Sequence, residues 1–295
     1  MSYKHIPTFA RWQWLNSAQI VDLLEIVAPP PPLRGRKGYS KTLLIRWLLY
    51  RQATNCTYRD LESMSGIHYS TFIKFRIRLR NEQWFEKLCQ MMTEAIIGER
   101  SGLELIMDSS FVPTYSEHAE NGSAFHGLYK QHGFKVHQII EFSTRLPVFQ
   151  IVSPGSLHDI RAAKQIVPLL PKHWSVKYFL ADRGYDSEQF VKQITKQWKS
   201  AWASIPLRRS PQRARGSKRQ ETIMNRLLKK AGRALHPTVY RKRTTIERYF
   251  SRKKYVFHLG QERTRHLTNF MTNCFTTSLM EILEWVSRQP RVVYG

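Results

Sequence analysis

The chain has 295 residues, and 42% of them are hydrophobic, which is enough for one large domain or two smaller ones. Its 47 Lys and Arg residues outnumber 22 Asp and Glu, and the formal net charge of +25 favours a polyanionic partner over a basic surface that only improves solubility. No stretch is apolar over the roughly eighteen residues that a membrane span needs, and the N-terminal residues lack the apolar core of a signal peptide.

The three cysteines are far apart in the sequence and form no C-x-x-C pair. This spacing argues against a zinc ribbon and against a disulfide framework. We therefore expect the protein to work in a reducing cytoplasm.

The first hundred residues have helical patterns. Residues 1–32 contain a short helical lead around 18–27 and end in the proline run 29–32, which cannot be helical and predicts a stiff linker. Residues 33–102 are predicted to be a helical DNA-binding region. Helical spacing begins after Ser40, and a second helix over 57–65 is ended by Gly66.

A third helix, opened by Ser70 or Thr71, completes a pattern that resembles helix-turn-helix. This helix would present basic side chains to DNA, namely Lys74, Arg76, Arg78 and Arg80. The alternative, an ordinary helical bundle with a charged face, remains open.

After residue 100 the hydrophobic period changes from the helical value towards two. Strands are predicted over 103–108, 135–141, 146–152, 176–181 and 200–205, with helices over 159–170 and 186–198. Three consecutive strands favour antiparallel pairing, and strands separated by helices favour parallel pairing. A mixed α/β sheet flanked by helices satisfies both patterns.

The segment 206–219 is polar, turn-rich and strongly basic, and it includes Arg208, Arg209, Arg213 and Arg215. It is either a disordered surface loop or an arm that orders on DNA. We place it within a catalytic domain over 103–265, followed by a C-terminal helix within 266–295.

Two acids are predicted to stand at strand ends. Asp108 ends the first strand and Asp182 ends the fourth, and open sheets with helical crossovers place sites at such carboxyl ends. Facing carboxylates repel each other, so a hard cation such as Mg²⁺ or Mn²⁺ between them is natural. Each Asp taken alone could instead be a turn or cap residue.

A third acid lies on a predicted helix. Tyr240, Arg243, Glu247 and Lys254 would form one stripe about 60° wide on a continuous α-helix. An apolar stripe beside it would anchor the helix on the sheet. Glu247 could complete a carboxylate set, while Arg243, Lys254 and Tyr240 could contact DNA. The alternative is a surface helix with helix-spaced ion pairs.

These residues resemble the DDE transposases of bacterial insertion sequences. The group with the Tyr-x2-Arg-x3-Glu-x6-Lys signature matches 240–254 in every gap, and the blocks around the two aspartates resemble 106–110 and 180–186. Segments 135–137 and 155–159 also look like family elements. The short span between Asp182 and Glu247 leaves no room for the β-rich insertion of some relatives, and the basic segment 206–219 could replace part of its role.

The resemblance implies an RNase H-like fold in which Asp108, Asp182 and Glu247 bind two Mg²⁺ or Mn²⁺ ions. It also implies double-stranded DNA partners, namely terminal inverted repeats and target DNA, and a homodimer in the synaptic complex. Water would attack first, and the freed 3′-OH would attack next, so Tyr240 is not a nucleophile. The location implied is the nucleoid of a bacterium or archaeon.

Other candidates carry less weight. Lys135 and His137 could touch the DNA backbone, or could be half-exposed strand residues. His158 and Asp159 could support the metal ligands from behind, or Asp159 could simply cap a helix. The tryptophans Trp174, Trp198 and Trp202 fit core packing better than stacking on a displaced base.

Two other functions remain open at this point. An RNase H-like nuclease or resolvase would share the acids but cut without joining. A catalytically dead DNA-binding regulator would keep the basic surface alone.

Overall fold

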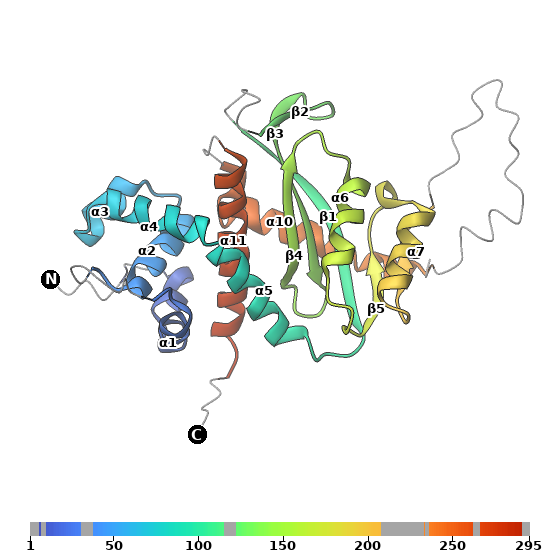
Figure 1. Ribbon diagram of the computed structural model, residues 1–295, viewed down its shortest axis with the longest axis horizontal. Coiled ribbons are helices and arrows are strands. Elements are labelled where there is room, and N and C mark those ends of the chain that lie inside the picture. Colours follow the sequence, from blue (N-terminus) through green and yellow to red (C-terminus); the bar gives the residue numbers. More distant parts are fainter. Residues whose placement is uncertain are drawn as a thin grey trace, which may run out of the picture. The chain divides into compact units, whose positions relative to one another are not determined.

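The computed structural model describes residues 6, 10–30, 38–114, 122–207, 233, 236–261 and 266–290. The chain divides into two compact units (Figure 1). The helical unit comprises Met1–Met92, Ser251–Thr264 and Thr268–Gly295, and the sheet unit comprises Thr93–Phe250 and Arg265–Leu267. The helical unit thus joins segments from both ends of the chain, whereas the sequence predicted four consecutive segments.

The helical unit contains most of the helices of the described chain. They are η1 (Ala10–Asn16), α1 (Ala18–Val27), α2 (Lys41–Thr54), α3 (Tyr58–Ser65), α4 (Tyr69–Asn81), most of α5 (Trp84–Ile97), the end of α10 (Thr244–Tyr255), η5 (Leu259–Gln261) and α11 (Leu267–Ser287). A capping box of Thr57 and Asp60 opens α3, and Gly66 at φ 69° ends it. The predicted turn is therefore present, although His68 rather than Ser70 or Thr71 caps α4.

A six-stranded mixed sheet forms the centre of the second unit. Its strands are β1 (Leu103–Pro113), β2 (Ala124–His126), β3 (Gln131–Glu141), β4 (Pro147–Pro154), β5 (Val176–Leu180) and β6 (Trp202–Ser204). The order is β2-β3-β1-β5-β6, with β4 also paired to β3; β1, β3 and β4 are antiparallel neighbours, whereas β1, β5 and β6 run parallel. The predicted mixed α/β fold is confirmed, and the short β2 is an addition to it.

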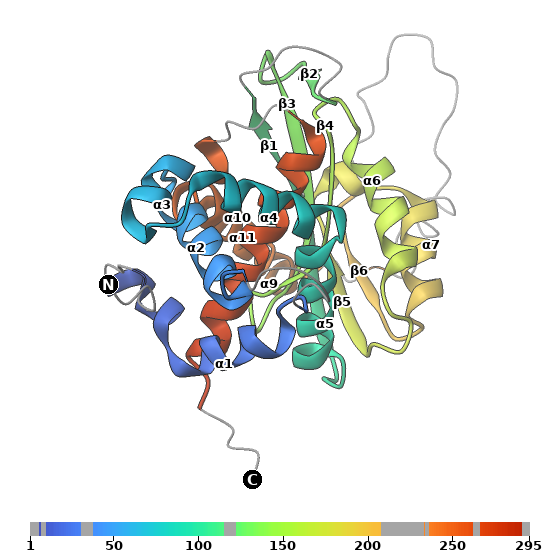
Figure 2. The same cartoon turned by 60° about the vertical axis from the view of Figure 1, so that its left-hand side comes forward.

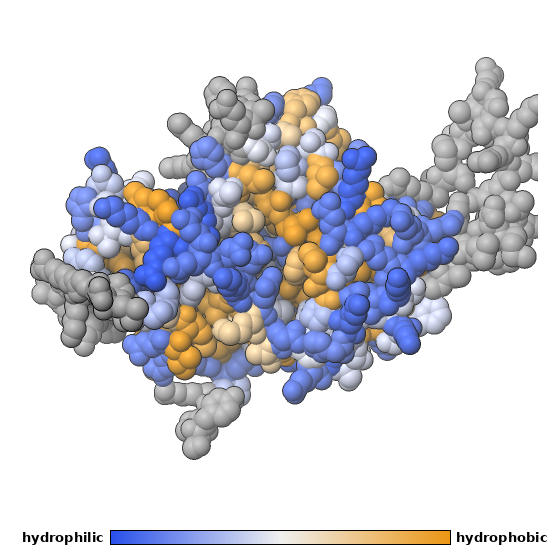
Figure 3. Space-filling view, in the orientation of Figure 1, coloured by the Kyte–Doolittle hydropathy of each residue, from blue (hydrophilic) through white to orange (hydrophobic). Residues whose placement is uncertain are grey.

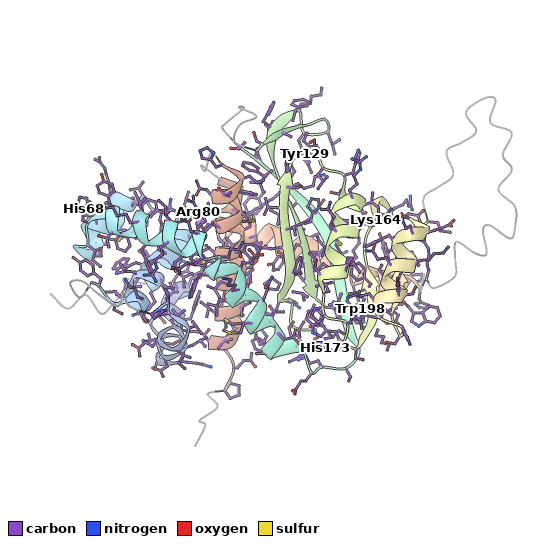
Figure 4. The ribbon with its side chains drawn as sticks, in the orientation of Figure 1. His68, Arg80, Tyr129, Lys164, His173 and Trp198 are labelled. Carbon is purple, nitrogen blue, oxygen red and sulfur yellow. The ribbon has the colours of Figure 1, made fainter. Side chains whose placement is uncertain are left out.

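One face of this sheet packs on α6 (Asp159–Ile166), η3 (Val167–Leu169) and α7 (Glu188–Gln197). Figure 1 shows α6 and α7 on this side of the sheet. Alternate residues of β1, Leu105 and Met107, join Phe179 and Phe190 in this core. Trp174 and Trp198 are buried there as predicted, and Figure 4 shows Trp198 among the side chains near the end of α7. Trp202 differs, because it is 51% exposed on β6.

The opposite face meets α9 (Pro237–Arg241) and the start of α10, which lie away from α6 and α7 (Figure 2). Glu104, which alternates with Leu105 along β1, pairs with Lys242 in the turn between α9 and α10 at 2.5 Å. That turn corrects the prediction of one continuous helix from Tyr240. Its hydrogen bonds run from i to i−3, such as Arg243 N to Tyr240 O at 3.0 Å, so the helix tightens there.

The described helices include none that is both long and apolar enough to cross a membrane. In the sheet unit, hydrophilic side chains cover much of the visible surface over α7 (Figure 3).

Candidate active site

Strand pairing brings Asp108 and Asp182 to the same level of the sheet. The parallel pairing of β1 with β5 ends at Ile106 and Leu180, and each aspartate stands two residues further along its own segment. β5 stops there, but β1 continues to Pro113 because β3 still pairs with it. Asp108 therefore lies within a strand, not at its end as predicted, and it lines the point where the sheet opens.

Local backbone geometry fixes both carboxylates. Asp182 caps the short helix η4 (Arg183–Tyr185) and accepts a hydrogen bond from Gly184 N at 2.7 Å. A Cβ at Gly184 would lie 2.8 Å from Asp182 Oδ1, so any other residue there would displace this carboxylate. Asp108 accepts a hydrogen bond from its neighbour Ser109 N at 2.8 Å.

Burial raises the pKa of the Asp108 carboxyl to about 6, and the charges of Asp182 and Asp159 act in the same direction. The hydrogen bond from Ser109 and the guanidinium of Arg243 oppose this rise without cancelling it. The two aspartates thus form a site where negative charge is poorly compensated, which is the electrostatic condition for binding a cation.

Arg243 connects this site to the third predicted acid. Its Nη1 lies 3.1 Å from Asp108 Oδ2 and its Nη2 lies 2.6 Å from Glu247 Oε1. The guanidinium also stands 5.8 Å from the ring centre of Tyr240. The sequence left an ion pair of Arg243 with Glu247 open, and this ion pair is present. The Arg243 guanidinium therefore stands between the carboxylates of Glu247 and Asp108.

Glu247 itself is 54% exposed at the start of α10. Within the described ranges no group of three or more His, Cys, Asp or Glu side chains is placed to hold a metal ion. Asp108 and Asp182 are close enough for their charges to interact, whereas Glu247 is connected to Asp108 through their shared contact with Arg243. Lys254 lies further along α10, half-buried in the helical unit, and burial lowers its pKa.

A polar cluster that the sequence did not predict lies next to Asp108. Ser109 Oγ donates to Asp159 Oδ1 at 2.7 Å, and the same oxygen is 3.0 Å from Lys135 Nζ and 3.7 Å from His137 Nδ1. Asp159 is the first residue of α6 rather than its cap, which is the exposed His158. The Asp-Ser-Ser block was the only sequence signal for Ser109.

Lys135 and His137 are both buried side chains of β3. Lys135 is 7% exposed and His137 is fully buried, because their strand β3 is covered on this face. Burial lowers the pKa of His137 to about 4, although Asp159 opposes the change, so its imidazole is neutral. Both side chains are buried, which contradicts the alternative of half-exposed strand residues, while their contact with the DNA backbone stays a prediction.

The basic residues of α4 also separate into two groups. Lys74 is exposed, whereas Arg76 Nη2 bonds to Asn273 Oδ1 at 2.5 Å and Arg80 Nη1 bonds to Asn269 Oδ1 at 2.8 Å, both on α11 (Figure 4 labels Arg80). Arg76 therefore links α4 to α11 within the helical unit. The predicted DNA contacts of the basic segment, Arg208, Arg209, Arg213 and Arg215, lie outside the described residues.

The fold is similar to that of the piggyBac transposase in a cryo-EM structure of its synaptic complex with hairpin DNA. The TM-score is 0.55 at 9% sequence identity, over 94% of this chain and 73% of that chain. This likeness concerns the fold alone. No match was found among curated proteins.

The transposase DDE domain family matches residues 99–280, a segment that contains β1 with Asp108, the turn with Asp182 and the start of α10 with Glu247. This match spans more than half of the chain and covers the whole described sheet. The chain therefore belongs to the transposase DDE domain family.

Proposed function

We propose that this protein is a DNA transposase that cuts and joins the ends of a bacterial insertion sequence by phosphodiester hydrolysis and transesterification. The observation that carries this proposal is the alignment of Asp108 and Asp182, two residues beyond the last β1–β5 pair, in a chain of the DDE family. The net charge of +25 supports a nucleic-acid substrate.

The donor set fits a divalent ion with hard-ligand preference. Asp108 and Asp182 both offer carboxylate oxygens, and burial raises the pKa of Asp108 to about 6. Mg²⁺ and Mn²⁺ favour such oxygen ligands. Asp108, Asp182 and, once released from Arg243, Glu247 would hold two such ions. When bound, these ions would supply activation of an attacking hydroxyl and charge stabilisation at the leaving oxygen.

The residues around the acids would bind and orient the DNA end. Arg243 is held between Asp108 and Glu247 in the described structure. A guanidinium binds phosphate with two parallel hydrogen bonds, so a DNA phosphate would draw Arg243 away from Glu247 and free that carboxylate. Tyr240, next to Arg243, and Lys254 would contact the same backbone.

The proposed substrates are the terminal inverted repeats of the element and then a target duplex. Two ends must meet before joining, so a homodimer is the assembly we propose. The similar piggyBac structure is a synaptic complex with hairpin DNA. DNA binding and the pairing of two DNA ends are therefore the first properties to test.

A cleavage assay tests the chemistry. Duplexes that carry the sequences flanking the gene would be cut in Mg²⁺ or Mn²⁺ and left intact in EDTA. Asp108→Asn, Asp182→Asn and Glu247→Gln should each abolish the cut while the proteins stay folded and bind DNA. Cleavage that persists in Asp108→Asn would reject the assigned site.

A joining assay then separates a transposase from a nuclease. Pre-cut ends with a free 3′-OH should be transferred into a supercoiled plasmid by the wild-type protein. Cutting without joining would instead show a resolvase-like nuclease, and DNA binding with neither activity would show a regulator.

A further inference from the structure

The side chain next to Asp108 on β1 belongs to the other face of the sheet. Successive residues of a strand point to opposite faces, so Asp108 meets Arg243 while Ser109 meets α6. Ser109 also sits opposite His137 in the pairing of β1 with β3, which puts these two side chains on one face. Any group that fixes Ser109 therefore fixes the backbone that carries Asp108.

Two side chains bind a single carboxylate oxygen at this face. Asp159 Oδ1 accepts the hydroxyl of Ser109 at 2.7 Å and lies 3.0 Å from the ammonium of Lys135. Lys135 Nζ donates further to Leu157 O at 2.9 Å, in the loop that leads into α6. A buried ammonium compensates the carboxylate, so α6 is tied to both β1 and β3 at the level of Asp108.

The turn after β5 reaches the same cluster. Tyr185, three residues beyond Asp182, is 1% exposed, and burial and the charges of Asp108, Asp159 and Asp182 raise its pKa well above the usual value. A polar contact with the Ser109 side chain acts in the opposite direction and lowers the pKa of the Tyr185 phenol. In the described part of the chain the Tyr185 hydroxyl makes no hydrogen bond of normal geometry, so Tyr185 lies close to the cluster without being bonded to it.

We propose that Asp159 is a positioning residue that, through Ser109, holds the β1 segment carrying Asp108 at the correct distance from Asp182 for a divalent ion. Asp159 would not itself bind the ion, because Ser109 and Lys135 hold its carboxylate on the face of the sheet opposite the one that Asp108 points to. The inference rests on the proposed metal-dependent function. Residues on the α6 face of the sheet would then support a metal site on the opposite face.

The test measures binding of Mn²⁺ alone to the full chain, by the loss of the free-ion electron paramagnetic resonance signal. Ser109→Ala removes the link to Asp159 and the contact of Ser109 with Tyr185, and keeps the ion pair of Asp159 with Lys135. Asp159→Asn keeps the shape and removes the charge. Each should weaken Mn²⁺ binding about tenfold, as is usual when a group that orients metal ligands is lost, and the double variant should weaken it by much less than the product.

Glu141→Gln is the matched control. Glu141, the last residue of β3, is a buried carboxylate that accepts hydrogen bonds from Ser143 Oγ at 2.7 Å and Thr144 Oγ1 at 2.8 Å. It resembles Asp159 in chemistry but lies outside the cluster, so its loss should leave Mn²⁺ binding unchanged. Thermal unfolding of every variant confirms that the chains compared are folded.

The outcomes distinguish the two proposals. A wild-type chain that binds no Mn²⁺ would overturn the metal-dependent function. Wild-type binding that Ser109→Ala and Asp159→Asn leave intact, or that Glu141→Gln weakens equally, would overturn the positioning role alone.

Discussion

Arg243 Nη1 lies 3.1 Å from Asp108 Oδ2, and the other terminal nitrogen of the same guanidinium holds Glu247 at 2.6 Å. One cation thus occupies the space between two acids that are proposed to bind metal. Under the proposed function, this guanidinium would have to leave the two carboxylates before both could bind metal.

Arg243→Lys should lose most DNA cleavage, because an ammonium cannot form two parallel bonds to a phosphate or bridge two carboxylates. We expect the cleavage rate of Arg243→Lys to fall roughly 10–100-fold. For Arg243→Gln, which removes the charge, we expect the slope of DNA affinity against salt to fall by about one. Rate assays and anisotropy titrations at several salt concentrations measure both. Wild-type cleavage by Arg243→Lys would show that bidentate contact plays no part.

Asp108→Asn should stabilise the metal-free protein at neutral pH. The folded carboxyl has a pKa of about 6 against 3.8 for the ordinary group, so the folded state binds more protons between these values and stability falls as pH rises through them. Removing the charge should add roughly 1–3 kcal/mol to the free energy of unfolding at pH 7.5, partly offset by the lost pairing with Arg243, and nothing at pH 4.

Urea unfolding at the two pH values measures this difference. Mg²⁺ should raise the stability of the wild type and leave Asp108→Asn unaffected, since a ligand stabilises only the state that binds it. An Asp108→Asn chain that is less stable at pH 7.5 than at pH 4, relative to wild type, would contradict the assignment.

Lys253, in the helical unit, makes stability depend on pH in the opposite direction to Asp108. Its ammonium is fully buried and donates to Ser278 Oγ at 2.7 Å, and burial lowers its pKa to about 8, although Cys274, Glu281 and Cys89 act against the change. Between pH 8 and the ordinary value of 10.5 the unfolded chain binds the proton and the folded chain does not, so this group's contribution to stability rises with pH.

Lys253→Met should therefore be more stable than wild type at pH 7, by roughly 1–3 kcal/mol, with the advantage shrinking above pH 8. The difference between the urea midpoints of the two chains measures the contribution of Lys253 together with its electrostatic coupling to Cys89 and Glu281. An advantage that grows above pH 8 would refute the assigned direction.

Lys74 and Arg76 test the division of the basic residues on α4. Lys74→Ala should weaken DNA binding and reduce the salt slope by about one without changing the melting temperature, because this side chain is exposed. Arg76→Ala should cost about 1–3 kcal/mol of stability, because Asn273 on α11 loses a charged hydrogen-bond partner.

Calorimetry and anisotropy on both variants provide the measurement, and each variant serves as the control for the other. Equal effects of the two substitutions on either quantity would reject the division.

Much of the sheet unit could be predicted from the sequence, because strand and helix patterns are local. The apolar runs before Asp108 and Asp182 and the alternation over 135–141 gave the correct elements and the mixed sheet. The spacing of Arg243 and Glu247 correctly indicated that these side chains could pair. The short β2 carries only three residues, too few for a periodic signal.

The sequence by itself determined the basic charge, the mixed sheet and the acids that stand beyond apolar runs. Only the tertiary structure decided that Lys135 and His137 face Asp159 instead of solvent, that Arg76 faces α11, and that Glu247 is held by Arg243. The physical reason is that a periodic pattern shows which residues share a face of one element. Whether that face is buried depends on partners distant in the chain, such as α6 against β3 or α11 against α4.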